Sequence, residues 1–226
     1  MFFMNPFRNL VRHHTERKLF FLFLSLVALL VVYPFFENDF LKSPVMISLL
    51  TGTLSLAMKE MENGGTQFLV ALGLGIPAII FSWIPVIVGY SDVVVAASYA
   101  FSLALYSFSS WAILRHIFRD HKVESDAVYG AISVYFLLGI IWASMFSLIG
   151  YFNPNAFTGM SGSVNLMWSD MLYYSYSTLS TLGIGDIMPV SELAKALTSL
   201  EAVVGVMYIA VLVSRFIGYS ENRGIL

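Results

Sequence analysis

Residues 178–186 read Thr-Leu-Ser-Thr-Leu-Gly-Ile-Gly-Asp and lie between two apolar segments. Gly183 and Gly185 alternate with larger residues, and glycine adopts backbone conformations with positive φ at no steric cost. A backbone of this kind can bend so that successive carbonyl groups point the same way. Four such strands around one axis would form rings of carbonyl oxygens that replace the water around a dehydrated cation. The chemistry open to this segment is therefore ion coordination by the main chain.

The composition is that of a membrane protein. The 226 residues are 58% hydrophobic and 12% charged, and the mean hydropathy is +0.78. The net charge of −2 gives no reason to expect nucleic acid as a partner, and the absence of cysteine excludes disulfides and thiolate metal sites. No His/Asp/Ser cluster, phosphate loop or metal-spaced set of carboxylates is apparent. We therefore expect neither an enzyme nor a cofactor, and membrane lipids are the expected surroundings.

Six segments are candidates for crossing a bilayer, whose core of about 30 Å needs roughly 20 apolar residues per helix. A polar turn, 37–42, is expected after the first, and the third contains Pro77 and Pro85 and is expected to be kinked. The segments are about 19–36, 44–58, 66–90, 93–114, 126–150 and 192–218, the second being weaker than the others.

The stretch 166–177 between the last two spans is apolar and aromatic but only about half as long as a spanning helix. We expect a re-entrant helix that enters the membrane and leaves on the same side. Non-helical backbone at membrane depth is tolerated only where it is buried in protein or lines a water-filled cavity. The segment 178–186 that follows this half-length helix is therefore predicted to line a pore.

This arrangement resembles prokaryotic tetrameric potassium channels of the pore-loop superfamily, over about residues 127–218. Residues 200–218, LEAVVGVMYIAVLVSRFIG, are similar to the inner helix of two-transmembrane channels in that superfamily. The resemblance implies an all-α membrane protein with six transmembrane helices, with a pore helix and a selectivity filter between the last two. One pore loop in a chain of this length cannot enclose an ion, so a homotetramer with three identical subunits as partners is expected.

Carried over residue by residue, the resemblance assigns roles around a potassium ion. The ion ligands would be main-chain carbonyls, with the Thr181 hydroxyl as the innermost ring, and Asp186 would attract cations at the outer mouth. Pore-helix support would come from Tyr173, Tyr174, Ser177, Thr178 and Glu201. Gly205 would be the inner-helix hinge, and the pore lining would be Val206, Ile209, Val213 and Ile217. The filter itself would comprise Thr181, Leu182, Gly183, Ile184 and Gly185.

One residue departs from the family pattern. Ile184 occupies the place where relatives have Tyr or Phe between the two glycines. Tyr173 and Tyr174 then have no hydroxyl partner at position 184, and we expect packing alone to hold the filter backbone. A potassium-selective channel is the leading hypothesis, and a weakly selective or non-selective cation channel is an alternative. A non-conducting scaffold with a vestigial filter is a third reading, against which the intact glycines argue.

Glu201 is an ionisable residue inside a predicted span, which by default suggests a functional role. We expect it to face the back of the filter and to pair with a pore-helix hydroxyl such as Ser177 or Thr178. The alternatives are a site on the ion path or a residue at the surface of the helix that extends toward the membrane interface.

The charge pattern predicts orientation and domains. With six spans and a cytoplasmic N-terminus, all but Lys42 and Lys195 of the twelve Lys and Arg lie on the cytoplasmic side. We expect both termini in the cytoplasm and the chain in the plasma (cell inner) membrane. The expected divisions are a basic segment 1–18, a four-helix domain 19–115, a linker 116–126, the pore domain 127–218 and a tail 219–226.

The fourth span, 93–114, has no Lys or Arg. Moving charge through the membrane potential is worth about 2.3 kcal/mol per elementary charge per 100 mV, so helices without charges cannot sense voltage steeply. We expect the first four helices to form a structural collar around the pore, with ligand or lipid sensing as the alternative.

Overall fold

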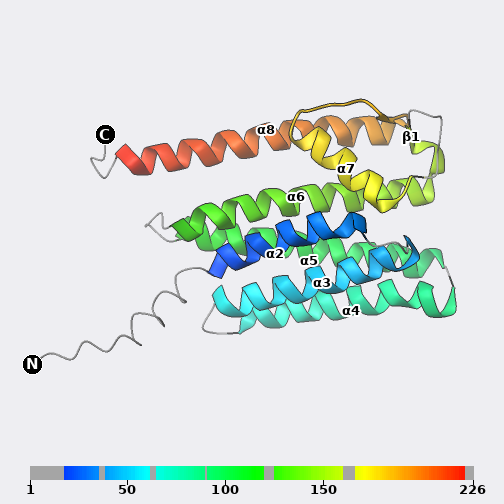
Figure 1. The fold of residues 1–226 in the computed structure, drawn as a ribbon, viewed down its shortest axis with the longest axis horizontal. Helices are drawn as coiled ribbons and strands as arrows, with labels where there is room; N and C mark the ends of the chain where they lie inside the picture. Colours follow the sequence, from blue (N-terminus) through cyan, green and yellow to red (C-terminus); the bar gives the residue numbers. More distant parts are fainter. Residues whose placement is uncertain are drawn as a thin grey trace, which may run out of the picture.

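The computed structural model describes residues 18–35, 39–61, 65–89, 91–119, 125–159 and 166–221. Its long helices lie side by side with roughly parallel axes, and α2 begins at the same end of the bundle at which α8 ends (Figure 1). The α-helices are α2 (Lys18–Val32), α3 (Asp39–Met61), α4 (Thr66–Val88), α5 (Asp92–Arg119), α6 (Ser125–Phe152), α7 (Trp168–Leu179) and α8 (Glu192–Glu221). Short 3₁₀ turns follow α2 (Tyr33–Phe35, η1) and α6 (Pro154–Ala156, η2).

α6 joins the two parts of the molecule. On one side it packs against α5 and α2, and α3 and α4 complete that bundle. A continuous apolar core fills the bundle, with Leu26, Leu54, Leu105, Leu137 and Ile140 fully buried in it. On its other side α6 packs against α7 and α8. The collar and the predicted pore region therefore share one helix as their common wall.

α7 is the half-length helix that the sequence predicts, and the chain around it enters and leaves at one end of the molecule. Before it, strand β1 (Phe157–Gly159) pairs antiparallel with strand β2 (Ile187–Pro189), which follows residues 178–186. Phe157 lies opposite Pro189 in this ladder. The chain thus returns at residue 187 to the place that it left at residue 159 (Figure 1). This small sheet is the one departure from the all-α expectation in the described chain.

A second apolar cluster fixes α7 against α6 and the small sheet. The rings of Phe146 in α6, Phe157 in β1 and Tyr174 in α7 form a triangle with centroids 5.3–5.5 Å apart and edge-to-face geometry. Aromatic pairs in this geometry contribute about 0.5–1.5 kcal/mol beyond the area that they bury. Leu179, Ile187 and other buried residues complete the cluster. The sheet and α7 are therefore held on α6 as one unit.

Several helices extend further than the sequence analysis predicts. α3 begins at Asp39 rather than near residue 44, so most of the expected polar turn is its first turn. α5 continues to Arg119, and α6 begins at Ser125, so the expected linker 116–126 is helical at both ends. The first helical turn favours acidic residues and the last turn basic ones, because each complements the helix dipole. The expected segment 1–18 lies almost wholly outside the described residues, as do residues 222–226 of the tail.

By length and composition, four of the described helical segments could cross a membrane: Thr66–Val88, Asp92–Arg119, Asp126–Phe152 and Glu192–Arg215. Leu19–Val32 is apolar but shorter. α4 is one continuous helix through Pro77 and Pro85. The chain is thus a helical protein with several membrane-spanning candidates, and the count of six spans stays a prediction.

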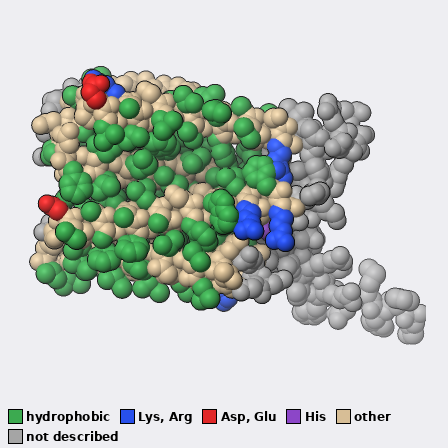
Figure 2. Space-filling view, turned by 180° about the vertical axis from the view of Figure 1, so that it is seen from behind, with side chains coloured by type: hydrophobic (Ala, Val, Ile, Leu, Met, Phe, Trp, Pro, Cys, Tyr) green, Lys and Arg blue, Asp and Glu red, His purple; other side chains and the backbone are tan. Residues whose placement is uncertain are grey.

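The surface is that of a protein surrounded by apolar material. Hydrophobic side chains cover most of the face in Figure 2, with most of the visible Lys and Arg toward one end, and Asp and Glu, with some Lys or Arg beside them, at the opposite end. Lys59, Arg115, Arg119 and Arg215 all lie near the C-terminal ends of α3, α5 and α8, which point the same way. An uneven distribution of Lys and Arg between the two ends is typical of multi-pass membrane proteins.

Asp126, in the first turn of α6, caps a different helix. Its Oδ1 accepts hydrogen bonds from the Leu19 and Phe20 amides at 3.0 and 3.1 Å. Amides in the first turn of a helix lack intrahelical partners, so a carboxylate there satisfies them and complements the helix dipole. This contact fixes the start of α2 against the start of α6.

We expect Asp126→Ala to lower the free energy of unfolding by about 1–2 kcal/mol, the range for losing a helix cap, whereas Asp126→Asn keeps an acceptor and most of the stability. Thermal unfolding in detergent measures both. Glu192→Gln, at an exposed ion pair, is the matched control and should change little. Equal stability of the Asp126→Ala variant and the unchanged protein would contradict the capping role.

Candidate functional site

α7 is anchored to α6 by side-chain hydroxyls. Ser175 Oγ and the Tyr176 hydroxyl donate to the carbonyls of Gly139 and Phe136 at 2.9 and 2.8 Å. The Tyr135 hydroxyl of α6 donates to the Leu179 carbonyl, at the end of α7, at 3.2 Å. Bonds of this kind satisfy buried hydroxyls and fix the position of one helix on another. The last turn of α7 is therefore held in place from the α6 side.

In the backbone after α7, positive φ values recur at every second residue. Thr181, Gly183 and Gly185 have φ values of 59°, 58° and 81°, while Leu182 and Ile184 are not among the positive-φ residues. Among the described residues, Thr181 is the only non-glycine residue with a positive φ. Such a conformation for a β-branched residue costs of order 1–3 kcal/mol and persists only where the surroundings impose it.

The amides of this segment turn toward α7. The Leu182 and Gly183 amides donate to the Ser177 carbonyl at 2.9 and 3.1 Å, and the Ile184 amide lies 3.3 Å from Ser177 Oγ. In a trans peptide the carbonyl points opposite to the amide that follows it, and the structure has no cis peptides among the described residues. The carbonyls of residues 181–183 therefore point away from α7. Ser177 holds this backbone, which corrects the expectation that packing alone would do so.

The face to which these carbonyls point is uncovered in the single chain. Residues 181–185 are all exposed, and the apolar side chains of Leu182 and Ile184 are 67% and 51% exposed. Exposed apolar residues next to unpaired carbonyl groups indicate a surface that is completed by other material. The arrangement can present carbonyl oxygens to a cation, provided that further copies enclose it.

α8 is covered along one stripe only. Its buried and half-buried positions recur at helical spacing and face α6 and α7, except that Arg215 contacts the end of α5. The predicted pore-lining residues Val206, Ile209 and Val213 lie off this stripe and are 53%, 47% and 48% exposed. The side chain of Ile217 lies outside the described residues. The covered stripe comprises Ala194, Leu197, Thr198, Glu201, Val204, Gly205, Tyr208, Leu212 and Arg215.

The predicted support residues divide into two groups. The Tyr174 hydroxyl lies 2.7 Å from Thr198 Oγ1 of α8, and Thr178 accepts the Thr181 amide through its carbonyl at 2.9 Å. Tyr173 instead interacts through its hydroxyl with Asp186, which also accepts the Ile187 amide at 3.0 Å. The two tyrosines therefore find partners at Thr198 and Asp186 rather than at position 184.

Glu201 is fully buried, and its partner differs from the predicted one. Ser175 Oγ lies 2.5 Å from Glu201 Oε1, so the hydroxyl is two residues earlier in α7 than Ser177. Glu201 pairs with a hydroxyl of α7, as expected, but that hydroxyl belongs to Ser175 and not to Ser177 or Thr178. That Glu201 faces the back of the filter stays a prediction. A place at the helix surface is also excluded by its burial.

Gly205 marks the closest approach of α8 to α7. A Cβ built on it would lie 2.2 Å from the Leu179 carbonyl oxygen, which is backbone and cannot move aside. α8 is one continuous helix through this position. The close approach gives Gly205 a packing role, and the hinge stays a prediction.

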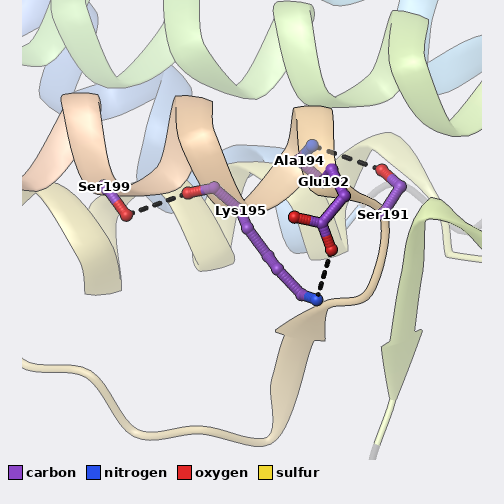
Figure 3. Close-up of polar contacts among 5 residues, drawn as sticks. All are labelled: Ser191, Glu192, Ala194, Lys195 and Ser199. Atoms are coloured by element: carbon purple, nitrogen blue, oxygen red, sulfur yellow. Dashed lines mark hydrogen bonds and ion pairs between the residues drawn. The ribbon is translucent and has the colours of Figure 1, made fainter.

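The start of α8 is ordered by local polar contacts. Ser191 Oγ accepts the Ala194 amide at 3.2 Å as an N-cap, and Lys195 pairs with Glu192 at 2.9 Å (Figure 3). The side chains of Glu192 and Lys195 are both more than half exposed, so this pair contributes little to stability. It places one charge of each sign at the start of α8.

Comparison with known proteins agrees with this geometry. Residues 130–221 match the family model described as ion channel. The match covers less than half of the chain and spans nearly all of α6, all of α7, the segment 178–186 and α8. No curated protein and no solved structure matches the chain. The match supports an ion-channel domain of the pore-loop type at residues 130–221, in a chain with several apolar helices.

The sequence analysis missed several residues that hold the site. Ser175, Thr198 and the hydroxyls of Tyr135 and Tyr176 connect α7 to its neighbours. The signal available was the density of hydroxyl-bearing residues in 173–178, YYSYST, which is unusual for a helix at membrane depth. Such groups need partners there, because water is absent.

We expect Gly205→Ala to displace the end of α7, because the added methyl would overlap the Leu179 carbonyl. Overpacking of this kind typically costs about 1–3 kcal/mol, and here it would also shift residues 178–186. Thermal unfolding in detergent measures the loss. Gly73→Ala, with open space around its Cβ, is the matched control. Two variants of equal stability would refute the close approach.

Proposed function

We propose that the chain conducts K⁺ passively across a membrane as a homotetramer, through a filter formed by Thr181, Leu182, Gly183, Ile184 and Gly185. The observation that carries the proposal is the alternating positive φ at residues 181, 183 and 185 after a half-length helix. Combined with the amide bonds to Ser177, this backbone turns its carbonyls to the uncovered face. The ion-channel match over the same region supports it.

Assembly follows from the open face of the single chain. One strand offers carbonyl oxygens to a cation from one side only, so several strands are needed to replace its hydration shell. The exposed apolar residues of α8 and the filter segment would then be covered by neighbouring subunits. Four copies give each carbonyl position a ring of four oxygens. The C-terminal end of α7, with its partial negative charge, favours a cation beyond it.

A weakly selective cation channel is the second candidate, and Ile184 favours it. Its side chain has no hydroxyl, and its amide bond to Ser177 Oγ is the longest of the three that hold the segment, at 3.3 Å. Selectivity depends on the number and field strength of the coordinating carbonyls and on how firmly they are held. A looser backbone at residue 184 would reduce discrimination between K⁺ and Na⁺.

We place the chain in the plasma membrane with six spans and both termini in the cytoplasm. The collection of basic residues at one end of the bundle supports this orientation (Figure 2). The filter would then lie at the outer mouth. The absence of Lys and Arg from residues 93–114 supports gating that is not steeply voltage-dependent.

We expect Gly183→Ala to abolish K⁺ current and to leave the tetramer intact. Open space surrounds a Cβ at this position, so the change acts through φ, which at 58° is unfavourable for alanine by roughly 1–2 kcal/mol per subunit. Current in planar bilayers and mass by light scattering measure the two effects. Gly150→Ala, in open space within α6, is the control. Unchanged conductance in Gly183→Ala would remove the filter assignment.

Reversal potentials separate the two candidate functions. With K⁺ on one side of the bilayer and Na⁺ on the other, a potassium-selective filter gives a large reversal potential, because only K⁺ crosses at an appreciable rate. We expect this result for the unchanged protein. A value near zero under the same conditions would discard potassium selectivity and support the weakly selective channel.

A further inference from the structure

Among the Asp, Glu, Lys, Arg and His side chains that the structure describes, Glu201 is the only buried one. It lies on the covered stripe of α8, away from the exposed positions assigned to the pore. Its neighbours on the other helices are Ser175 and Tyr174 of α7 and Tyr135 of α6. None of these is a cation, so an ionised Glu201 would be an unpaired charge inside the protein.

Other described carboxylates are satisfied in a different way. Asp126, Asp170 and Asp186 each accept a backbone amide. Glu201 has one polar partner, the Ser175 hydroxyl, and its Oε2 atom is buried without any hydrogen bond. A buried carboxylate with a bare oxygen is strongly disfavoured, whereas the carbonyl oxygen of a neutral acid can be left unpaired at much lower cost.

The number of hydrogens available at Ser175 also favours a neutral Glu201. Its hydroxyl has a single hydrogen, yet Ser175 Oγ lies within hydrogen-bond distance of two oxygens, Gly139 O at 2.9 Å and Glu201 Oε1 at 2.5 Å. The Gly139 carbonyl can only accept. If Ser175 donates to Gly139, the second contact requires a hydrogen on Glu201. The 2.5 Å separation is in the range of a short hydrogen bond between oxygens, not of two lone pairs facing each other.

We propose that Glu201 is a neutral carboxylic acid that donates from Oε1 to Ser175, while Ser175 donates to the Gly139 carbonyl. The resulting relay connects α8, α7 and α6 through three oxygen atoms. Two residues beyond Ser175, Ser177 accepts the amides of the filter segment through its carbonyl and hydroxyl. Glu201 is therefore a positioning residue for the filter, a role that rests on the proposed function.

Loss of the proton from Glu201 would break this relay. Ser175 would have to turn its single hydrogen to the carboxylate, which would leave the Gly139 carbonyl without it and a negative charge buried among hydroxyls and rings. Both changes loosen the last turns of α7 on α6. A glutamine at position 201 avoids them, because its amide group donates to Ser175 as the acid does and carries no charge.

Infrared spectroscopy of the full chain in lipid at neutral pH tests the protonation. The carbonyl stretch of a protonated carboxylic acid is resolved from that of a carboxylate. We expect such a band in the unchanged protein, its loss in Glu201→Gln, and its retention in the matched control Glu192→Gln, which alters an exposed acid on the same helix (Figure 3). A spectrum without the band, or a band that survives Glu201→Gln, would overturn the proposal.

The positioning role is tested by the K⁺/Na⁺ permeability ratio. We expect Glu201→Gln to match the unchanged protein, and Glu201→Ala and Ser175→Ala each to lower the ratio by roughly tenfold, about the effect of one buried hydrogen bond. The double variant should be no worse than either single one, because both remove the same relay. If Glu201→Ala does not assemble, the permeability ratios of Ser175→Ala and Glu201→Gln still test the positioning role.

The outcomes remain separable from the proposed function. A glutamine variant that behaves like the alanine variant would refute the neutral acid, and an unchanged ratio in Ser175→Ala would refute the positioning role. Absence of any cation current in the unchanged protein would refute the proposed function instead, and the infrared band would still report the protonation of Glu201.

Discussion

The structure depends on how the chain satisfies backbone groups where water is scarce. In the filter segment the amides of Leu182, Gly183 and Ile184 turn to Ser177, so the preceding carbonyls are left to face the open side. A carbonyl without a partner costs several kcal/mol in an apolar medium. Such groups persist only if water or a cation meets them. The same bonds that fix the backbone on α7 therefore leave these carbonyls on the other face, where the proposed function needs them.

The contacts of α7 with α6 and α8 fix the position of Ser177. α7 is too short to be stable through its own helical bonds alone, so its position comes from packing and from hydroxyl bonds to α6 and α8. The aromatic triangle of Phe146, Phe157 and Tyr174 secures the middle of α7, and Tyr135 secures the Leu179 carbonyl at its C-terminal end. Gly205 lets α8 approach that same carbonyl. The filter segment is thus supported at its base from two helices.

Length and composition were sufficient to predict the helices and the half-length α7, because hydropathy over many residues is a strong signal. Helix ends were less predictable: α3 begins at Asp39, and Arg119 reads as loop from the sequence but lies in the last turn of α5, where a basic residue complements the helix dipole. The β1–β2 pair has only three residues per strand and carries no periodicity. The partner of Glu201 depends on how α7 crosses α8, and Ser175 and Ser177 cannot be told apart from spacing alone.

Arg215 connects α8 to the end of α5. Arg215 donates to the Ile117 carbonyl at the end of α5 at 2.9 Å, and its guanidinium lies 4.0 Å from the centre of the Phe118 ring. Between this point and Gly205, the Tyr208 hydroxyl donates to the Ala131 carbonyl of α6 at 2.6 Å. A movement of the C-terminal half of α8 away from α5 would therefore break this contact. Because α5 also packs against α4 and α6, these helices are linked to α8 through contacts at the basic end of the bundle, while residues 93–114 of α5 carry no Lys or Arg.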